Sequence, residues 1–235
     1  MKAWYVVLAV LAVLGFSAPA SALDLEMPAL YLSAKFGVSF MSAGDIANTT
    51  TIPAGMTPAT PTKTSGSNTV MPLGGAFGYN WEKHGLPLRT ELEYLYRTNA
   101  GTSANPSFIN AAVPTSFSAS MTSQTLFVNA YYDVKIWETV VPYVGGGLGT
   151  SWNNTTTDGK LLSTGDVARY RQSTQSFAWN VGAGVGYHIT DHIILDMNYR
   201  YVDLGEVAWG SKSVAEVTAK NLTANELLFG VRYQF

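Results

Sequence analysis

The chain contains eight stretches in which apolar side chains recur at every second position. That period is expected of a β-strand whose two faces meet different surroundings. No amphipathic helical pattern of useful length lies between the stretches. The alternation therefore predicts an all-β protein with strands at residues 29–40, 70–81, 87–97, 121–134, 140–152, 174–189, 192–204 and 222–235.

The predicted connections alternate in length. Tight turns occur at 82–86, 135–139 and 190–191, whereas the connections at 41–69, 98–120, 153–173 and 205–221 are long. Long structureless loops are unusual in compact soluble domains. Short turns at one end and long loops at the other are typical of a transmembrane β-barrel of the bacterial outer membrane. Both termini would then lie with the short turns, at the periplasmic end.

The two faces of each predicted strand differ in charge. In the third stretch, for example, Glu91 and Glu93 alternate with Leu92 and Tyr94. Aromatic residues lie near the ends of the apolar rows, as expected for girdles at the two interfaces of a membrane. They are Tyr79, Trp81, Tyr94, Tyr96, Tyr132, Trp152, Trp179, Tyr187, Tyr201 and Tyr233. A soluble lipocalin-like barrel is the alternative, but it does not explain these aromatics. Only a closed barrel satisfies every backbone group of a sheet in lipid.

The first 22 residues have the pattern of a secretory signal peptide. Lys2 precedes an apolar run over residues 3–16, and Ala20-Ser21-Ala22 forms a small-residue cleavage site. The run is shorter than the roughly 18 residues expected of a spanning helix. We therefore expect residues 1–22 to be removed on export and residues 23–235 to form one outer-membrane β-barrel domain.

Composition narrows the possible functions. The chain has no cysteine, which excludes disulfides, thiolate metal sites and a lipoprotein anchor. A net charge of −2 suggests no basic surface for nucleic acid.

The chain ends in a strand pattern that finishes on an aromatic residue. The alternating apolar positions are Phe229, Val231, Tyr233 and Phe235. This ending, together with "LRTELEYLYR" (88–97), "PYVGGGLG" (142–149) and "NVGAGVGYHITDHIILDMNYRYVDLG" (180–205), resembles the OmpA/OmpX-type and opacity-like eight-stranded surface-antigen family. The resemblance covers all eight strands. It implies that the last strand closes the barrel on the first and is an assembly signal for the barrel-assembly machinery.

Nine charged residues are expected to point into the barrel. An eight-stranded barrel has an interior just wide enough for its own side chains, and isolated buried charges are very unfavourable, so these residues should pair. The cations are Lys35, Arg89, Arg200 and Arg232, and the anions are Glu91, Glu93, Asp133, Asp196 and Glu226. We expect a salt-bridge network that plugs the lumen. Inward glycines at 74, 78, 145, 147, 182, 184 and 186 either leave open space or make room for large neighbours.

No catalytic or cofactor site is predicted. The histidines, His84, His188 and His192, all lie at or beside predicted short turns, and no Ser-His-acid group can be assembled at the opposite end. His188 and His192 flank one turn and could bind a metal, but a solvated pair of this kind is usually not a ligand site. The glycines at 182–186 lie within a strand, so we do not interpret them as a dinucleotide motif.

Two functions remain. The first is a non-catalytic outer-membrane surface protein, with a structural, antigenic or adhesin-like role carried by four long extracellular loops. Its partners would be membrane lipid, the assembly machinery, and host surfaces or other envelope components. The second is a small gated porin or ion channel through the lumen.

Overall fold

A computed structural model describes residues 29–49, 66–104, 115–161, 167–211 and 215–235. The predicted signal peptide lies outside these residues. No helix among them is long and apolar enough to cross a membrane.

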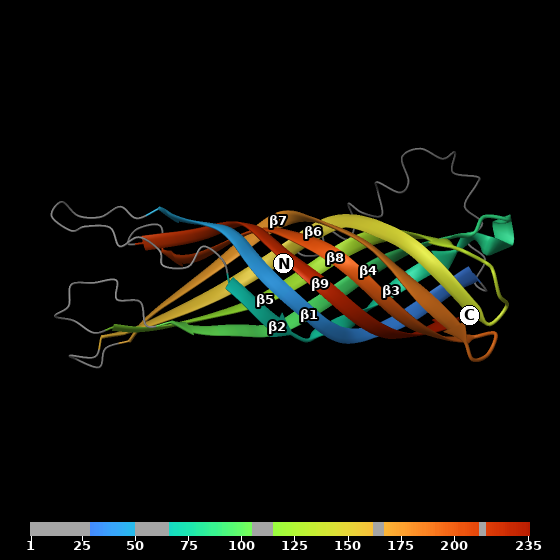
Figure 1. Cartoon of the computed structure of the whole chain (residues 1–235), viewed down its shortest axis with the longest axis horizontal. Helices are drawn as coiled ribbons and strands as arrows, with labels where there is room; N and C mark the ends of the chain where they lie inside the picture. Colours follow the sequence, from blue (N-terminus) through green and yellow to red (C-terminus); the bar gives the residue numbers. More distant parts are fainter. Residues whose placement is uncertain (1–28, 50–65, 105–114, 162–166, 212–214) are drawn as a thin grey trace.

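The described residues form one antiparallel sheet that closes into a barrel (Figure 1). Its strands are β1 (Leu30–Thr49), β2 (Gly66–Val70), β3 (Pro72–Asn80), β4 (Leu88–Ala104), β5 (Thr115–Asp133), β6 (Val140–Leu161), β7 (Val167–His188), β8 (Ile193–Ser211) and β9 (Ala215–Gln234). β1 pairs with β9 from Tyr31↔Gln234 to Thr49↔Glu216, which closes the sheet.

β2 and β3 are two parts of one strand. Both pair with β1 in the same register, through Ser39↔Val70 and Phe36↔Leu73. Pro72 has no backbone N–H to donate to a ladder, which accounts for the break between them. The barrel is therefore eight-stranded, and the predicted fold class is confirmed.

Three short connections gather at one end of the barrel, on the right in Figure 1. The β3–β4 connection contains the 3-10 helix η2 (Trp81–His84), which ends at Gly85 with a φ of 75°. In the β7–β8 turn, Thr190 Oγ1 accepts hydrogen bonds from the backbone N–H groups of His192 and Ile193. The chain ends at the same end, where the Phe235 N–H donates to the Leu30 carbonyl.

The strands are longer than predicted at the opposite end. β6 reaches Leu161 rather than residue 152, and β7 begins at Val167 rather than residue 174. The predicted long loops are therefore wrong in large part, because most of these residues continue the sheet. Residues 50–65, 105–114, 162–166 and 212–214, which join these extended strands, lie outside the described residues.

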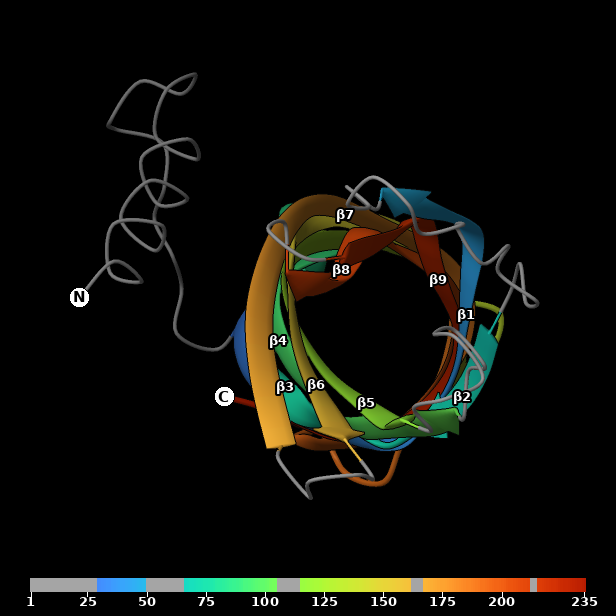
Figure 2. The same cartoon turned by 90° about the vertical axis from the view of Figure 1, so that its left-hand side faces the viewer.

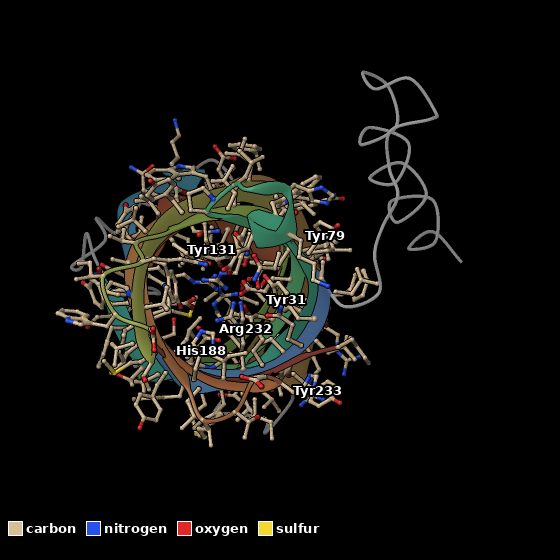
Figure 3. All side chains as sticks on the ribbon, turned by 90° about the vertical axis from the view of Figure 1, so that its right-hand side faces the viewer. Tyr31, Tyr79, Tyr131, His188, Arg232 and Tyr233 are labelled. Carbon is tan, nitrogen blue, oxygen red and sulfur yellow. The ribbon has the colours of Figure 1, made fainter. Side chains whose placement is uncertain are left out.

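The two faces of the barrel carry different side chains. Large apolar residues such as Phe36, Phe77 and Leu148 are exposed on the outside, with exposed tyrosines such as Tyr132 and Tyr233 among them. Polar, charged and small residues alternate with them and are buried inside (Figure 3). An apolar exterior around an interior that contains charged and polar side chains is the arrangement expected of a barrel in lipid.

Candidate functional site

The structure places all nine charged residues singled out in the sequence inside the barrel. They come from five strands. Lys35 is on β1, Arg89, Glu91 and Glu93 on β4, Asp133 on β5, Asp196 and Arg200 on β8, and Glu226 and Arg232 on β9. Seven of the nine residues are buried, and Lys35 and Asp196 are close to buried, with 12% and 11% of their side chains exposed.

Six charges form one continuous chain through the interior. Lys35 contacts both Glu91 and Glu93, with 2.6 Å between Lys35 Nζ and Glu93 Oε2. Arg200 joins Glu93 to Glu226, through contacts of 2.7 Å from Nη1 and 2.9 Å from Nη2. Because Glu93 and Glu226 each contact two cations, the chain links strands from opposite sides of the barrel.

The sixth member, Arg97, was missed by the sequence reasoning. Its Nε lies 2.6 Å from Glu226 Oε1, and neither side chain has any exposed surface. Arg97 Nη1 also donates to Thr125 Oγ1 at 3.0 Å. The signal was present, since Arg97 continues the alternation of Glu93 and Leu95, and the prediction ended that row too early. Among the residues that the structure describes, this network thus contains five cations rather than four, which equals its number of anions.

Two further ion pairs lie nearer the short-turn end. Arg89 Nε donates to both carboxylate oxygens of Asp133, at 2.9 and 2.7 Å. Arg232 is held more loosely, with 3.3 Å between its Nε and Asp196 Oδ2. Figure 3 shows Arg232 pointing into the interior at this end, close to Tyr31.

Neutral side chains complete the coordination of Glu91. The hydroxyls of Tyr31 and Tyr131 donate to its two carboxylate oxygens at 3.2 and 3.0 Å, and Asn129 Nδ2 is 3.4 Å away. The tyrosine rings also contact cations, with the Arg232 guanidinium 5.3 Å from the centre of the Tyr31 ring.

The inward glycines make room for these large side chains. A Cβ at Gly78 would lie 2.2 Å from the Tyr31 ring, and one at Gly184 would lie 2.5 Å from Tyr143. A Cβ at Gly182 would lie 2.5 Å from Arg200 Cβ. Of the two interpretations of these glycines, the structure favours space for neighbours over an open path.

An apolar cluster occupies the interior on the loop side of the charge network. It is built from buried side chains of β1, β2, β4, β5, β7, β8 and β9. Its members are Met41, Val70, Ala100, Met121, Phe127, Ala178, Val202, Leu204, Val207, Ala219, Leu222 and Ala224. The sequence analysis did not predict this layer, although the strand period places Phe127, Ala178 and Val202 on the same face as the charged residues.

β8 leaves the barrel wall and enters the interior at this level. Pairing between β7 and β8 stops at Trp179↔Asp203, and β8 then bulges around Gly205, whose φ is 74°. The view from the loop end shows β8 inside the ring, beneath β7 (Figure 2).

Side chains of β6 donate hydrogen bonds to the displaced segment of β8. Ser151 Oγ donates to the Leu204 carbonyl at 2.6 Å, and Thr155 Oγ1 donates to the Ala208 carbonyl at 2.7 Å. Asn153 Nδ2 lies 3.2 Å from both the Leu204 and the Glu206 carbonyls. These bonds satisfy carbonyl groups that no longer bond to β7.

A wider cavity of about 400 Å³ opens at the short-turn end. It is lined by charged residues, including Glu82, Lys135 and Asp133, and by His188 and the exposed Trp137. Arg232 also lines this cavity and separates it from the charge network. We call this cavity the vestibule.

The four C-terminal residues assigned to the assembly signal lie on the outer face of β9 and at its end. Phe229, Val231, Tyr233 and Phe235 are all exposed. Tyr233 packs edge-on against Phe235, with 5.3 Å between ring centres.

The three histidines are far from the loop end. His84 shares a 2.8 Å hydrogen bond with the Tyr79 hydroxyl, and His192 Nδ1 lies 2.8 Å from the Gln234 carbonyl oxygen. His188 points into the vestibule end of the barrel (Figure 3). The described part of the chain contains no group of three or more His, Asp or Glu side chains that could hold a metal ion.

Known proteins that resemble this chain are outer-membrane proteins. A family model for the outer membrane protein beta-barrel domain matches residues 8–235. Outer membrane protein PagN of Salmonella typhimurium is 26% identical over 247 residues, an alignment that covers both chains completely.

Many solved structures match this chain, among them the following two. Neisserial surface protein A (NspA) has 22% identity and a TM-score of 0.43, with 88% of this chain and 97% of that chain covered. OprG of Pseudomonas aeruginosa has 17% identity and a TM-score of 0.48, with 88% and 97% covered.

Proposed function

The chain belongs to the outer membrane protein beta-barrel family, and we propose that it is a non-catalytic surface protein whose lumen is plugged and whose loop end makes the functional contacts. The barrel is the membrane-embedded part of this protein. The role at the surface would be structural, antigenic or adhesin-like.

The observation that carries this proposal is the filling of the lumen in two layers. A linked chain of salt bridges crosses the interior from Lys35 to Arg97. An apolar layer around Phe127, Leu204 and Leu222 lies on the loop side of these salt bridges. Ions would have to break the first layer and then pass the apolar side chains of the second, which disfavour an ion.

The loop end supports a surface role, because the sheet continues there with polar residues. On β6 and β7, the residues beyond Trp152 and before Phe177 are mostly Asn, Thr, Ser, Gln and Arg. Arg169 donates to both Asp158 oxygens, at 2.6 and 3.0 Å, across this exposed ladder. The hydrogen bond from Arg169 lowers the pKa of Asp158. Such a paired, exposed sheet offers a rigid surface to a partner.

The proposal includes the route to the membrane. The signal peptide would direct export, both ends of the mature chain would face the periplasm, and the exposed aromatics of β9 would be recognised by the barrel-assembly machinery. The pairing of β9 with β1 supports the last point, since this seam must form for the barrel to close.

Conductance of the refolded mature protein in a planar bilayer tests the plugged lumen. We expect no steady open level, while protease resistance confirms insertion. A reproducible level that shifts in Glu91→Gln or Arg200→Gln would mean that the lumen conducts.

A gated channel is the second candidate function, and the vestibule is the observation that supports it. Arg232 lines the vestibule and is the most loosely paired cation of the network. If partner exchange at Arg232 opened a path, Arg232→Gln should raise the conductance, whereas the plugged barrel should remain silent in the same variant.

Shortening the β6–β7 hairpin tests the surface role. Replacing residues 156–171 with a two-residue Asn-Gly turn keeps the remaining register, because Thr155 pairs with Gln172. Cells that display this variant should adhere less to host-cell layers or to each other than cells with the intact barrel. Equal adhesion, repeated after shortening β4–β5 and β8–β9, would exclude a contact role for these hairpins.

A further inference from the structure

β7 has an open edge at the loop end of the barrel. Its last pairing with β8 is Trp179↔Asp203, whereas its pairing with β6 continues to Lys160↔Val167. Over residues 167–178, β7 is therefore paired with a neighbouring strand on one side only. Among the described strands, none pairs with the other side of this stretch. We call that side of residues 167–178 the open edge.

Contacts in the interior keep β8 away from the open edge. The carbonyls of Leu204, Glu206 and Ala208 accept hydrogen bonds from side chains of β6. Ser176 Oγ of β7 donates to the Glu206 carbonyl and accepts from the Glu206 N–H, both at 3.2 Å, which fixes the point where the two strands separate. The place beside β7 in the barrel wall is thus left by β8, which lies beneath β7 in Figure 2.

Backbone groups of every second residue on β7 point toward the open edge. In an antiparallel pair, the N–H and carbonyl groups of successive residues face opposite sides of the strand. The carbonyls of Gln172 and Ser176 lie on the β6 side, where they accept hydrogen bonds from Thr155 and Thr150. The residues between and beyond them therefore direct their backbone groups to the open edge. These are residues 169, 171, 173 and 175.

The open edge lies beyond the apolar part of the outer face. Phe177 faces outward on β7, and 65% of its surface is exposed. Toward the loop end, the next outward side chains are polar or charged, and all are exposed: Gln175, Ser173, Arg171 and Arg169. Unpaired backbone groups are costly in lipid but are solvated in water. The open edge is therefore on the aqueous side of the membrane interface, where another protein can reach it.

The side chains beside the open edge favour an acidic partner. Asp158 of β6 pairs with Arg169, which leaves the positive charge of Arg171 in excess over these three residues. On an added strand, an acidic residue directly opposite Arg171 would form a favourable cross-strand pair.

A second copy of the barrel in the same membrane does not fit the open edge. Strands of such barrels are tilted by about 35–45° from the barrel axis. A two-fold rotation about the membrane normal reverses the tilt on the facing sides, so two β7 strands would cross at roughly 70–90° and could not pair. Strand pairing at this edge therefore requires a separate, extended chain.

We propose that an extended acidic segment of an extracellular protein binds to the open edge by strand addition, in the place that β8 leaves. The backbone of this segment pairs with residues 169–175 of β7, and one of its acidic side chains faces Arg171. This inference rests on the proposed surface role and specifies which element of the loop end makes the contact.

Amide exchange in the refolded mature protein, resolved by NMR in micelles, tests the open edge itself. The amide protons of residues 171, 173 and 175 should exchange roughly tenfold or more faster than those of residues 172 and 174, which face β6. Equally slow exchange at all five positions would show that the edge is covered, and the proposal would be wrong.

A peptide probe tests strand addition. The probe is a blocked decapeptide that alternates threonine and glutamate, and the comparison peptide alternates threonine and lysine. At millimolar concentration, the glutamate peptide should slow exchange several-fold at residues 171, 173 and 175, whereas the lysine peptide should not. Absence of protection by the glutamate peptide, or equal protection by both peptides, would overturn the proposal.

Ser173→Pro separates strand addition from a contact of side chains alone. Proline lacks the N–H that an added strand needs, and an edge position that makes no ladder bond tolerates it. The glutamate peptide should no longer protect residues 171 and 175 in this variant. Ser173→Ala is the matched control, because it keeps the N–H and should keep the protection. If the two variants are protected equally, the peptide binds by its charge and strand addition is refuted.

Adhesion of cells that display these variants distinguishes this inference from the proposed surface role. Ser173→Pro should reduce adhesion as much as the shortened β6–β7 hairpin does, and Ser173→Ala should not reduce it. If the shortened hairpin reduces adhesion and Ser173→Pro does not, the surface role stands and strand addition is wrong. If no shortened hairpin changes adhesion, the surface role itself is wrong.

Discussion

Arg200 of β8 and Glu93 of β4 meet inside the barrel, with 2.7 Å between Nη1 and Oε1, although 107 positions separate them in the sequence. Each also contacts a second partner, Glu226 and Lys35 respectively. This pair is thus the central link of the six-charge chain, and it ties together strands that do not neighbour each other in the sheet.

We expect Arg200→Met to destabilise the barrel by about 3–5 kcal/mol, because it leaves Glu93 and Glu226 with one cation each and the interior with an excess negative charge. Urea unfolding in micelles, followed by tryptophan fluorescence, measures the change. Arg169→Gln is the control, since that arginine is exposed, and it should leave the midpoint unchanged.

The double variant Arg200→Met/Glu93→Gln should be less destabilised than Arg200→Met alone. Removing both members leaves two intact pairs, Lys35–Glu91 and Arg97–Glu226, and restores charge balance. A double-mutant cycle measures this coupling. If the two effects simply add, Arg200 and Glu93 do not depend on each other and the linked-chain description fails.

Gly78→Ala should destabilise the barrel by about 1–3 kcal/mol, because its methyl group would overlap the Tyr31 ring and force it from its place beside Glu91. Thermal or urea unfolding provides the measurement. At Gly44 the nearest atoms lie 3.9 Å from an added Cβ, so Gly44→Ala is a suitable control that should show little loss. Equal stability of both variants would show that Tyr31 has room to move.

The sequence predicts the strands well where they cross the lipid, and less well where they extend past it at the loop end. The short-turn ends of the strands were located within a few residues, since apolar and aromatic residues such as Tyr132 and Tyr187 alternate with small or polar ones up to the turn. At the other end, "NNTTT" (153–157) is polar on both faces, so alternation gave no sign that β6 continues to Leu161. There the pairing with β5 and β7 holds the strand, and a single strand's sequence does not contain that information.

The interior was predictable only in part for a related reason. The inward direction of a charge follows from strand period, so the nine charges could be assigned to one face and Arg97 could have joined them. Which cation meets which anion depends on strand tilt across the barrel, and the contact of Arg97 with Glu226 spans 129 positions. The displacement of β8 depends on Ser151, Asn153 and Thr155 of another strand, so β8 alone does not indicate it.

Asn153→Ala should loosen the inward segment of β8. The substitution removes the hydrogen bonds to the Leu204 and Glu206 carbonyls, which leaves both more dependent on Ser151 and Ser176. Hydrogen exchange followed by mass spectrometry should show faster exchange over residues 203–208, with no change over the charge network on β4. Unchanged exchange over residues 203–208 would mean that the bulge at Gly205 holds the segment without help from β6.

Asp158 should titrate below the usual range of an aspartate, because Arg169 stabilises its charged form by hydrogen bonding. Because the pKa of Asp158 is lowered in the folded state, the ion pair stabilises the folded hairpin above the normal aspartate pKa. This stabilisation is lost as the pH falls through the lowered pKa. Carboxyl NMR titration of the refolded protein measures the value, and Arg169→Gln should return it toward about 3.9. Arg171→Gln is the control; it removes a weaker charge contribution and should shift the pKa less. An equal shift in the two variants would mean that general positive charge, rather than the bidentate contact across β6 and β7, sets the pKa, and the rigid paired surface proposed for the loop end would lose its best local support.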